Sequence, residues 1–248
     1  SSIRHVLFGA SPMPEAVLKT ALQVIPNAQF HHVYGQTEAG PVLTALPPNR
    51  MVEEGPLAGK IKSAGVAIPG VEIKIVDEDD IEVPRGTVGE ICGQGENVML
   101  GYWNQPEMTA HTLRNGWLHT GDGGRMDEDG FVYVVDRVKD MIISGGENVY
   151  SAEVENAIYQ HPGIVECAVI GIPHEKWGEQ VHAIVRLAEG EALDEAAVIA
   201  HCHEWIANYK CPRSVSFVTP PLPLSGAGKI LKTDLRKPYW EGHEKQVN

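Results

Sequence analysis

Positive charge is scarce in this sequence relative to negative charge. Twenty lysine and arginine residues stand against 33 aspartate and glutamate residues, which gives a formal net charge of −13. Because a nucleic-acid surface needs a basic face, this balance argues against a nucleic-acid partner. Long apolar runs are also missing, and none approaches the ~20 residues that a transmembrane helix needs. We therefore expect no membrane span.

Cysteine is rare, and its spacing is uninformative. The chain has four cysteines, Cys92, Cys167, Cys202 and Cys211. They form no Cys-x-x-Cys pair, and the first residues lack the charged-then-apolar pattern of a secretion signal. We expect a reduced, cytoplasmic protein.

The beginning of the chain has the pattern of an α/β sheet. Residues 4–9 and 28–35 are predicted to be strands, and residues 14–25 between them have the apolar spacing of a helix with Pro14 in its first turn. Strand, helix and strand in this order are typical of an α/β fold. Two strands are too few for a sheet that is stable in water, so further chain or a partner should complete it.

The pattern changes from about residue 71. Short apolar runs separated by Gly, Pro and Asp predict the strands of a small β-subdomain, at residues 71–76, 86–93 and 130–136. It changes again near residue 138. We place a domain boundary between residues 138 and 139 and expect residues 139–248 to form a compact α+β domain.

The elements predicted for residues 139–248 alternate between strands and helices. A hairpin should turn on Gly145-Gly146, and a short helix should begin with Ser151 as its N-cap and end before Gly163. Asp194 should cap a second helix over residues 193–209. Three further strands are expected, at residues 166–173, 179–187 and 214–220.

Two loops of the first 138 residues carry polar groups that suit a nucleotide. The segment VYGQTEAG at 33–40 follows a predicted strand, where ligands of α/β sheets bind. The ring of Tyr34 can stack on a base, and the hydroxyl of Thr37 with the carboxylate of Glu38 suits Mg²⁺ and phosphate. A polar turn explains these residues equally well. In GWLHTGDGG, Asp122 can hold two ribose hydroxyls, although a simple Asp-Gly turn is the commoner explanation.

Two later segments carry basic residues and glycines. In the stretch at 134–155, Arg137 and Lys139 alternate with apolar residues, and Gly145-Gly146 would let a thin ligand pass close to the backbone. In PLPLSGAGKILK, Lys229 follows two glycines and a serine. This is not the phosphate-loop template, because a proline replaces the first glycine and an isoleucine follows the lysine. We interpret it as a lysine on a hinged loop that meets an anion.

The histidine pairs suggest no metal site. His201 and His203 are two positions apart on a predicted helix, so their side chains point to different faces. His31 and His32 face opposite sides of a predicted strand. We expect a structural role for at least one of this second pair.

Four motifs in order, YGQTE, GWLHTGD, DRVKDMIISGGENVYSAEVE and SGAGKILKTDLR, resemble the later motifs of the AMP-forming acyl-CoA synthetase superfamily. This superfamily also holds adenylation domains and luciferases. The resemblance covers nearly the whole chain from LFGASPMP onward. It implies a large N-terminal domain hinged to a small, mobile C-terminal domain. It also implies two reactions in one site: a carboxylate attacks the α-phosphate of ATP, and the coenzyme A thiol then displaces AMP.

The resemblance also assigns roles to residues. It implies contacts to adenine from four positions, namely Gly9, Ala10, Ser11 and Tyr34, and it places Gly35 among the cofactor-binding residues. Thr37 would contact phosphate and Glu38 would bind Mg²⁺. Asp122 would hold the ribose hydroxyls, with Arg137 reaching ribose or phosphate.

For residues 139–248 the resemblance implies three further roles. Lys139 occupies the hinge position, and Gly145 with Gly146 lies beside the pantetheine arm. Lys229 matches the lysine of the adenylation step, where a positioned ammonium stabilises charge spread over carboxylate and phosphate oxygens.

One departure from the family pattern is the missing upstream loop that ends in Pro-Lys-Gly and cradles the β- and γ-phosphates. The chain therefore resembles the C-terminal half of a synthetase, whether an expressed piece, a proteolytic product or part of a split protein. We expect it to need the N-terminal half for catalysis, and to self-associate through exposed sheet surface. The string IISGGEN resembles that of fatty-acyl and aryl-acid CoA ligases rather than that of peptide-synthetase adenylation domains. We expect a medium- or long-chain fatty acid as substrate, with an aryl acid as the alternative. A non-catalytic fragment that binds a nucleotide or a partner is a rival interpretation.

Overall fold

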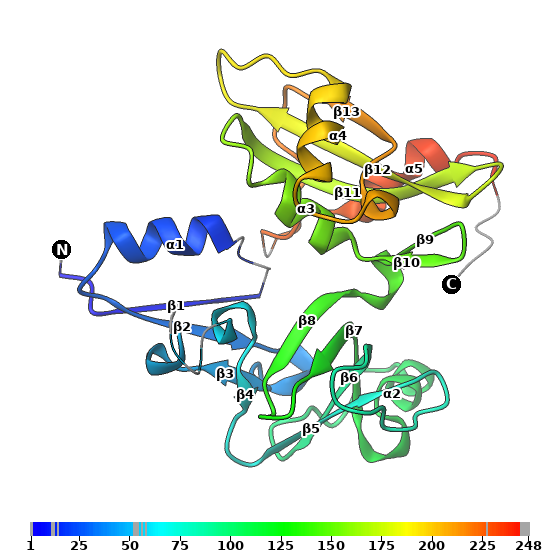
Figure 1. The fold of residues 1–248 in the computed structure, drawn as a ribbon. Coiled ribbons are helices and arrows are strands. Elements are labelled where there is room, and N and C mark those ends of the chain that lie inside the picture. The colour runs from blue at the N-terminus through cyan, green and yellow to red at the C-terminus, as the bar shows by residue number, and fades with distance from the viewer. Residues whose placement is uncertain are drawn as a thin grey trace. The chain divides into compact units, whose positions relative to one another are not determined.

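The computed structural model describes residues 2–10, 13, 15–51, 55, 57, 59–226 and 228–243. The chain divides into two compact units, Ser1–Val138 and Lys139–Asn248 (Figure 1). We call them the first unit and the second unit. None of the described helices is long and apolar enough to cross a membrane.

The first sheet of the first unit begins with the predicted strand, helix and strand. These are β1 (His5–Gly9), α1 (Glu15–Val24) and β2 (Gln29–Tyr34), with β1 and β2 parallel. β3 (Thr44–Leu46) and β4 (Val66–Ala67) extend the sheet in the order β1-β2-β3-β4. Further chain does extend the two predicted strands, as expected, but β3 and β4 themselves were missed, because they are too short to leave an apolar pattern.

The second sheet of the first unit is an antiparallel meander, which confirms the predicted β-subdomain. Its strands are β5 (Val71–Val76), β6 (Gly89–Gly95), β7 (Leu118–Met126) and β8 (Val132–Arg137), in the order β5-β6-β7-β8. The helix α2 (Pro106–Thr112) lies in the connection between β6 and β7. A small apolar core forms from Ile75, Ile91, Met126 and Val132.

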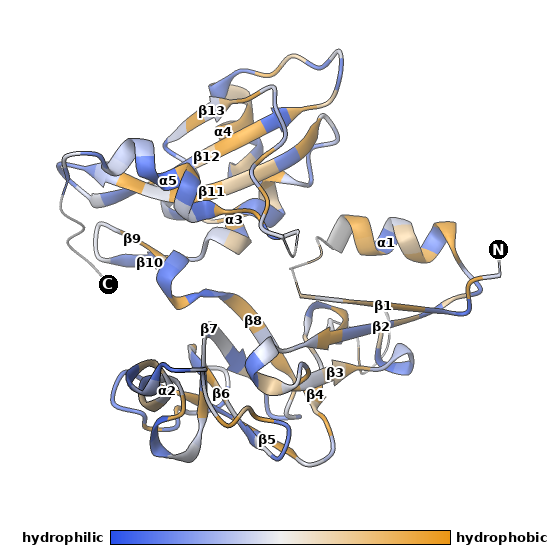
Figure 2. Ribbon diagram, turned by 180° about the vertical axis from the view of Figure 1, so that it is seen from behind, coloured by the Kyte–Doolittle hydropathy of each residue, from blue (hydrophilic) through white to orange (hydrophobic). Residues whose placement is uncertain are grey.

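The second unit contains a five-stranded sheet with helices packed against its apolar residues. β9 (Ile142–Ser144), β10 (Glu147–Val149), β11 (Ile164–His174) and β12 (Gly178–Leu187) pair in the order β10-β9-β12-β11, and β13 (Ser214–Phe217) runs parallel to β12. The helices are α3 (Ser151–Ile158), α4 (Glu195–His203) and α5 (Lys232–Trp240). Figure 2 shows the apolar character of β11 and β12.

Two apolar clusters hold the helices of the second unit. Val154 and Ile158 of α3 belong to one cluster, together with Val198 and Cys202 of α4. α5 belongs to the other cluster, through Leu235 and Tyr239. Each 100 Å² of apolar surface buried in such clusters stabilises the fold by about 2.5 kcal/mol.

Two predicted helix boundaries in the second unit were wrong. Tyr150 occupies the N-cap position of α3, and Ser151 is the first helical residue, fully buried, with its hydroxyl 2.5 Å from Lys232 Nζ. α4 ends at His203 rather than at residue 209, and the side chains of Trp205 and Tyr209 beyond it are exposed. Asp194 does cap this helix, because its side chain accepts a hydrogen bond from Ala197 N.

The start of α5 is attached to α3 by polar contacts. Lys232 Nζ lies 2.7 Å from Glu155 Oε1 and also contacts the Ser151 hydroxyl. The same Glu155 oxygen accepts a hydrogen bond from Val169 N of β11. Lys232 therefore joins the C-terminal helix to both α3 and the sheet.

Short 3₁₀ turns complete the described structure. They are Thr37–Ala39, Pro48–Arg50, Lys60–Lys62, Arg114–Gly116, Val138–Asp140 and Asn208–Lys210.

Candidate active site

The parallel strands β1 and β2 end side by side, so two predicted segments lie at one edge of the sheet. Gly9 pairs with Val33, one residue before Tyr34. A Cβ atom on Gly9 would lie 2.1 Å from Val33 O, so the close approach of the strands requires glycine. Ala10 follows in the left-handed region with φ +64°. Ser11, the third predicted adenine contact in this segment, lies outside the described residues.

A second predicted group, Tyr34, Asp122 and Arg137, is brought together in the first unit. Tyr34 OH donates a hydrogen bond of 2.9 Å to Asp122 Oδ2, and Arg137 Nε lies 3.4 Å from Asp122 Oδ1. Burial and the charge of Asp122 raise the pKa of Tyr34 well above its usual value. The phenol therefore stays protonated and remains a donor to the carboxylate.

Asp122 is not a turn residue, contrary to the commoner explanation of its motif. It lies within β7 and pairs with Arg137 of β8. Opposite it, the register of β6 shifts, so that Thr120, Gly121 and Asp122 face only Ile91. The glycine sequence thus forms a β-bulge, a device that redirects a side chain.

Thr37 and Glu38 form the 3₁₀ turn that follows β2. Thr37 is exposed. Glu38 Oε1 accepts a hydrogen bond of 2.6 Å from Tyr102 OH, and Glu38 O accepts one from Met99 N. The other carboxylate oxygen of Glu38 has no hydrogen bond among the described residues. An oriented carboxylate with a free hard oxygen fits Mg²⁺.

The backbone after Glu38 is held by Asn97, a residue that sequence reasoning missed. Its Nδ2 donates hydrogen bonds of 2.6 Å to Ala39 O and 2.9 Å to Val42 O. Gly35 is equally constrained, because a Cβ there would lie 2.2 Å from Pro41 O. No local pattern could reveal Asn97, since its partners lie 58 and 55 residues away.

Lys229 of the second unit lies in a tight turn between β13 and α5. Ser225 N donates to Lys229 O at 2.7 Å, and Lys229 N donates to Ser225 Oγ at 3.1 Å. Gly228 adopts φ +76° in this turn. The Lys229 ammonium group has no hydrogen-bond or ion-pair partner among the residues that the structure describes.

Gly145 and Gly146 form the turn of the β9–β10 hairpin, as predicted. Both have positive φ, +65° and +86°, which glycine adopts most readily. A Cβ on Gly145 would lie 2.7 Å from the Trp177 ring, whereas space beside Gly146 is open. Lys139, predicted as the hinge, is exposed, and its carbonyl accepts a hydrogen bond from Arg236 Nη1.

The histidine pairs have separate structural partners. His201 Nε2 lies 3.1 Å from Ala157 O, whereas His203 Nδ1 lies 2.9 Å from Asn208 Oδ1. His32 stacks on Phe8 and contacts Ser63 O, which confirms a structural role for one histidine of the earlier pair.

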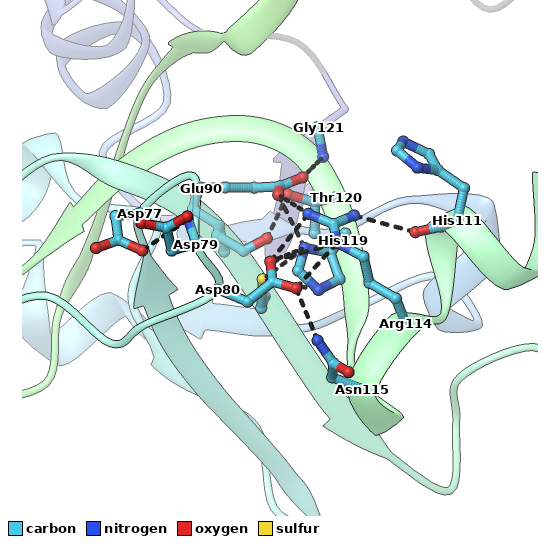
Figure 3. A network of polar contacts seen from close by, with 12 residues as sticks. Asp77, Asp79, Asp80, Glu90, His111, Arg114, Asn115, His119, Thr120 and Gly121 are labelled. Carbon is cyan, nitrogen blue, oxygen red and sulfur yellow. Dashed lines mark hydrogen bonds and ion pairs between the residues drawn. The ribbon is translucent and has the colours of Figure 1, made fainter.

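One unexpected group, Glu90, Cys92 and His119, has the residue types of a metal site. Its candidate ligand atoms all lie within 4.8 Å of one another. However, Arg114 Nη2 lies 3.2 Å from Glu90 Oε2 and already supplies a positive charge (Figure 3). Burial, then the charge of Glu90, raises the pKa of Cys92 to about 12. Glu90 and His119 already contact each other at 2.8 Å, so the hydrogen bonds and the ion pair describe this group as a polar network.

Comparison with known families gives two matches in this chain. Residues 1–103 match the family described as AMP-binding enzyme, and residues 153–229 match the AMP-binding enzyme C-terminal domain. A fatty acid–[acyl-carrier-protein] ligase from Streptomyces coeruleorubidus is 40% identical over 100% of this chain and 47% of its own length. A feruloyl-CoA synthase from an Amycolatopsis species is 44% identical over 96% of this chain and 47% of its own length. The chain thus spans about half the length of these curated relatives.

Solved structures give the same result at the level of the fold. The o-succinylbenzoate CoA synthetase of Bacillus subtilis with its acyl-adenylate intermediate matches with a TM-score of 0.84 and 35% identity. The match covers 94% of this chain and 46% of that chain. The same enzyme with ATP and a magnesium ion matches with a TM-score of 0.83 at 34% identity, over the same shares of the two chains. The expected mixed α/β and α+β fold is confirmed.

Proposed function

Because the chain belongs to the AMP-binding enzyme family, whose matched structures are adenylate-forming enzymes, we propose that it is the C-terminal part of an ATP-dependent acid–thiol ligase. The single observation that carries this proposal is the Tyr34–Asp122–Arg137 group at the end of β2. A carboxylic acid would react with ATP to give an acyl-adenylate and pyrophosphate. A thiol would then attack the acyl carbon, giving a thioester and AMP.

The first unit would bind the nucleotide. Asp122 would accept hydrogen bonds from the two ribose hydroxyls, in place of its present bond from Tyr34. The Tyr34 ring would pack on adenine, and Arg137 would donate to ribose or phosphate. Thr37 would contact phosphate. Glu38 would hold Mg²⁺, which supplies charge neutralisation for the phosphates when bound.

The second unit would supply the charge for the adenylation step. Negative charge on the attacking carboxylate and the α-phosphate is spread over several oxygens, and a positioned ammonium stabilises it. Lys229 suits this role because its ammonium has no ion pair among the described residues that must break first. Lys139 would act as the hinge that changes its backbone angles between the two reactions.

The thiol of the second reaction would belong to a pantetheine arm. Gly146 leaves open space at the tip of the β9–β10 hairpin, which supports passage of a thin ligand. We favour coenzyme A. The relative from Streptomyces coeruleorubidus is named for an acyl-carrier protein, so a carrier-protein thiol is the second candidate.

We favour a fatty acid over an aryl acid as substrate. The fatty-acid ligase relative supports the first and the feruloyl-CoA synthase relative supports the second. The test is a panel of fatty and aryl acids, assayed in the full-length ligase by trapping the acyl-adenylate with hydroxylamine. Turnover with a fatty acid alone would establish the preferred class, and turnover with aryl acids alone would reverse it.

The rival proposal is a protein that binds nucleotide without turnover. Calorimetry with AMP and ATP, beside the hydroxylamine assay on the same full-length preparation, separates the two. Binding without adenylate formation from any acid would favour the rival.

We place the ligase in the cytoplasm, which its four free cysteines support.

A further inference from the structure

The bulge that carries Asp122 has a backbone donor directed at a side chain of the neighbouring strand. Gly121 adopts φ +71° in the bulge. Its N–H donates a hydrogen bond of 2.9 Å to Glu90 Oε1. Because Gly121 directly precedes Asp122, this contact constrains the backbone from which the Asp122 side chain projects. Glu90 is therefore hydrogen-bonded to the residue next to the proposed ribose carboxylate.

The other oxygen of Glu90 is held from two directions. His119 Nδ1 lies 2.8 Å from Glu90 Oε2, and Arg114 Nη2 lies 3.2 Å from the same atom (Figure 3). The His119 side chain is only 2% exposed. Glu90 is thus bound at both oxygens, and its carboxylate has little freedom to turn away from Gly121.

Arg114 is itself fixed by a second carboxylate. Its Nη2 lies 3.1 Å from Asp80 Oδ1, and Asn115 Nδ2 donates to Asp80 Oδ2 at 2.8 Å. The hydrogen bond from Arg114 holds the pKa of Asp80 below its usual value. These contacts join the β5–β6 connection, which carries Asp80, to the bulge of β7.

Asp122 is held from the other side by Tyr34 and Arg137. A ribose would compete with these two partners, whereas the Gly121–Glu90 hydrogen bond does not involve the Asp122 side chain. When a nucleotide replaces Tyr34, the bulge still needs a fixed backbone, because mispositioned hydrogen bonds lose strength steeply. Glu90 supplies this constraint.

We propose that Glu90 is a positioning residue for ribose recognition: its carboxylate, held by His119 and Arg114, fixes the β7 bulge in the conformation that presents Asp122 to the ribose. The proposal rests on the proposed function of Asp122. It predicts that changes at Glu90, which contacts no ribose atom, alter the preference for ATP over 2′-deoxyATP.

The experiment measures kcat/KM of the full-length ligase for ATP and for 2′-deoxyATP in the adenylation step. Glu90→Asp keeps the charge but withdraws the carboxylate by about 1.5 Å, one C–C bond length. Glu90→Ala removes the contact altogether. The matched control is Glu82→Asp, an exposed carboxylate before β6 that pairs with Arg85 outside this network. Asp122→Ala gives the reference for lost ribose recognition.

We expect Asp122→Ala to lower the ATP/2′-deoxyATP ratio by roughly 10- to 100-fold, the loss of one charged hydrogen bond. Glu90→Ala should lower the ratio almost as much as Asp122→Ala does. The ratio for Glu90→Asp should lie between those of Glu90→Ala and the unsubstituted ligase, and Glu82→Asp should leave the ratio unchanged. Combining Glu90→Ala with Asp122→Ala should lower the ratio no further than Asp122→Ala does.

A folded Glu90→Asp protein with the parental ratio would overturn the proposal, as would additive effects in the double variant. A lower melting temperature with an unchanged ratio would assign Glu90 to stability alone. An unchanged ratio in Asp122→Ala would instead overturn the proposed function of Asp122, so the two failures are distinguishable.

Discussion

In the first unit, Tyr34, Asp122 and Arg137 already contact one another, and Glu38 is already bound by Tyr102. In the second unit, the ammonium of Lys229 has no partner among the described residues, and it follows a glycine in a turn. A prearranged group binds with little cost of ordering. A charge without a partner can be delivered and withdrawn without breaking an ion pair. Under the proposed function, the contrast would separate a surface that binds the nucleotide from a charged group that serves only the adenylation step.

The largest expected effect comes from Lys229→Ala in the full-length ligase. Loss of the ammonium should lower ATP–pyrophosphate exchange by roughly 10²- to 10³-fold or more, because it stabilises charge in the adenylation transition state. Thioester formation from pre-made acyl-adenylate should be far less affected. Equal losses in both assays would remove the distinction drawn between the two units.

A change at Gly146 should affect the opposite half-reaction. Gly146→Trp fills the open space at the hairpin and should slow thioester formation by about 10²-fold while leaving pyrophosphate exchange nearly intact, since misplacement of a reacting group costs that much. Gly190→Trp is the control, because Gly190 has the same positive φ and open surroundings elsewhere in the second unit. If both variants slow thioester formation alike, backbone strain rather than blocked access is the cause.

Asp122→Ala probes the binding surface of the first unit. Two charge-assisted hydrogen bonds to the ribose would be lost, each contributing about 1.5–3 kcal/mol, and Tyr34 would lose its acceptor. We expect the Kd for ATP to rise at least ~10-fold for each bond, as measured by calorimetry. Unchanged affinity in a folded variant would leave Asp122 as a purely structural residue of the bulge.

The smallest expected effect is on the pH dependence of stability. Burial lowers the pKa of His182, against an opposing influence of Glu195, so the folded state favours the neutral ring. The unfolded chain then binds more protons near pH 6.5. This contribution to stability is complete above that pH and is lost as the pH falls below it. The melting temperature should fall by a few degrees between pH 7.5 and 5.5, and His182→Gln should flatten that slope. An equal slope in the variant would show that other groups dominate.

The sequence pattern predicted the elements that have apolar periodicity and failed for those without it. The β1–α1–β2 segment and the β9–β10 hairpin were expected from alternating apolar residues and a Gly-Gly turn. α5 was missed because just two of its residues, Leu235 and Tyr239, pack against the apolar cluster of the sheet. In addition, Pro238 lies within the helix and breaks the usual helical pattern. Polar contacts of Lys232 hold this helix in addition to those two apolar residues, and polar contacts leave no periodic signal.

The residues of the candidate site were named in advance where a family motif contains them, whereas their contacts with residues distant in the sequence were not. Tyr34 and Asp122 were expected from motifs, but their direct hydrogen bond joins residues 88 positions apart. Tyr102 and Glu90 were missed for the same reason, since their contacts to Glu38 and Gly121 span 64 and 31 positions. The Gly-Asp-Gly string also misled, because glycines permit a bulge as readily as a turn.

The attachment of Lys232 has a mechanical consequence for the second unit. Lys232 follows Lys229 by three residues and is tied to Ser151 and Glu155 of α3, the helix that directly follows the β9–β10 hairpin. These contacts tie the start of α5, three residues after Lys229, to the helix that follows the glycine hairpin. If the second unit rotates as one body between the two proposed half-reactions, the Lys229 turn and the glycine hairpin would move together. Neither loop would then need a conformational change of its own.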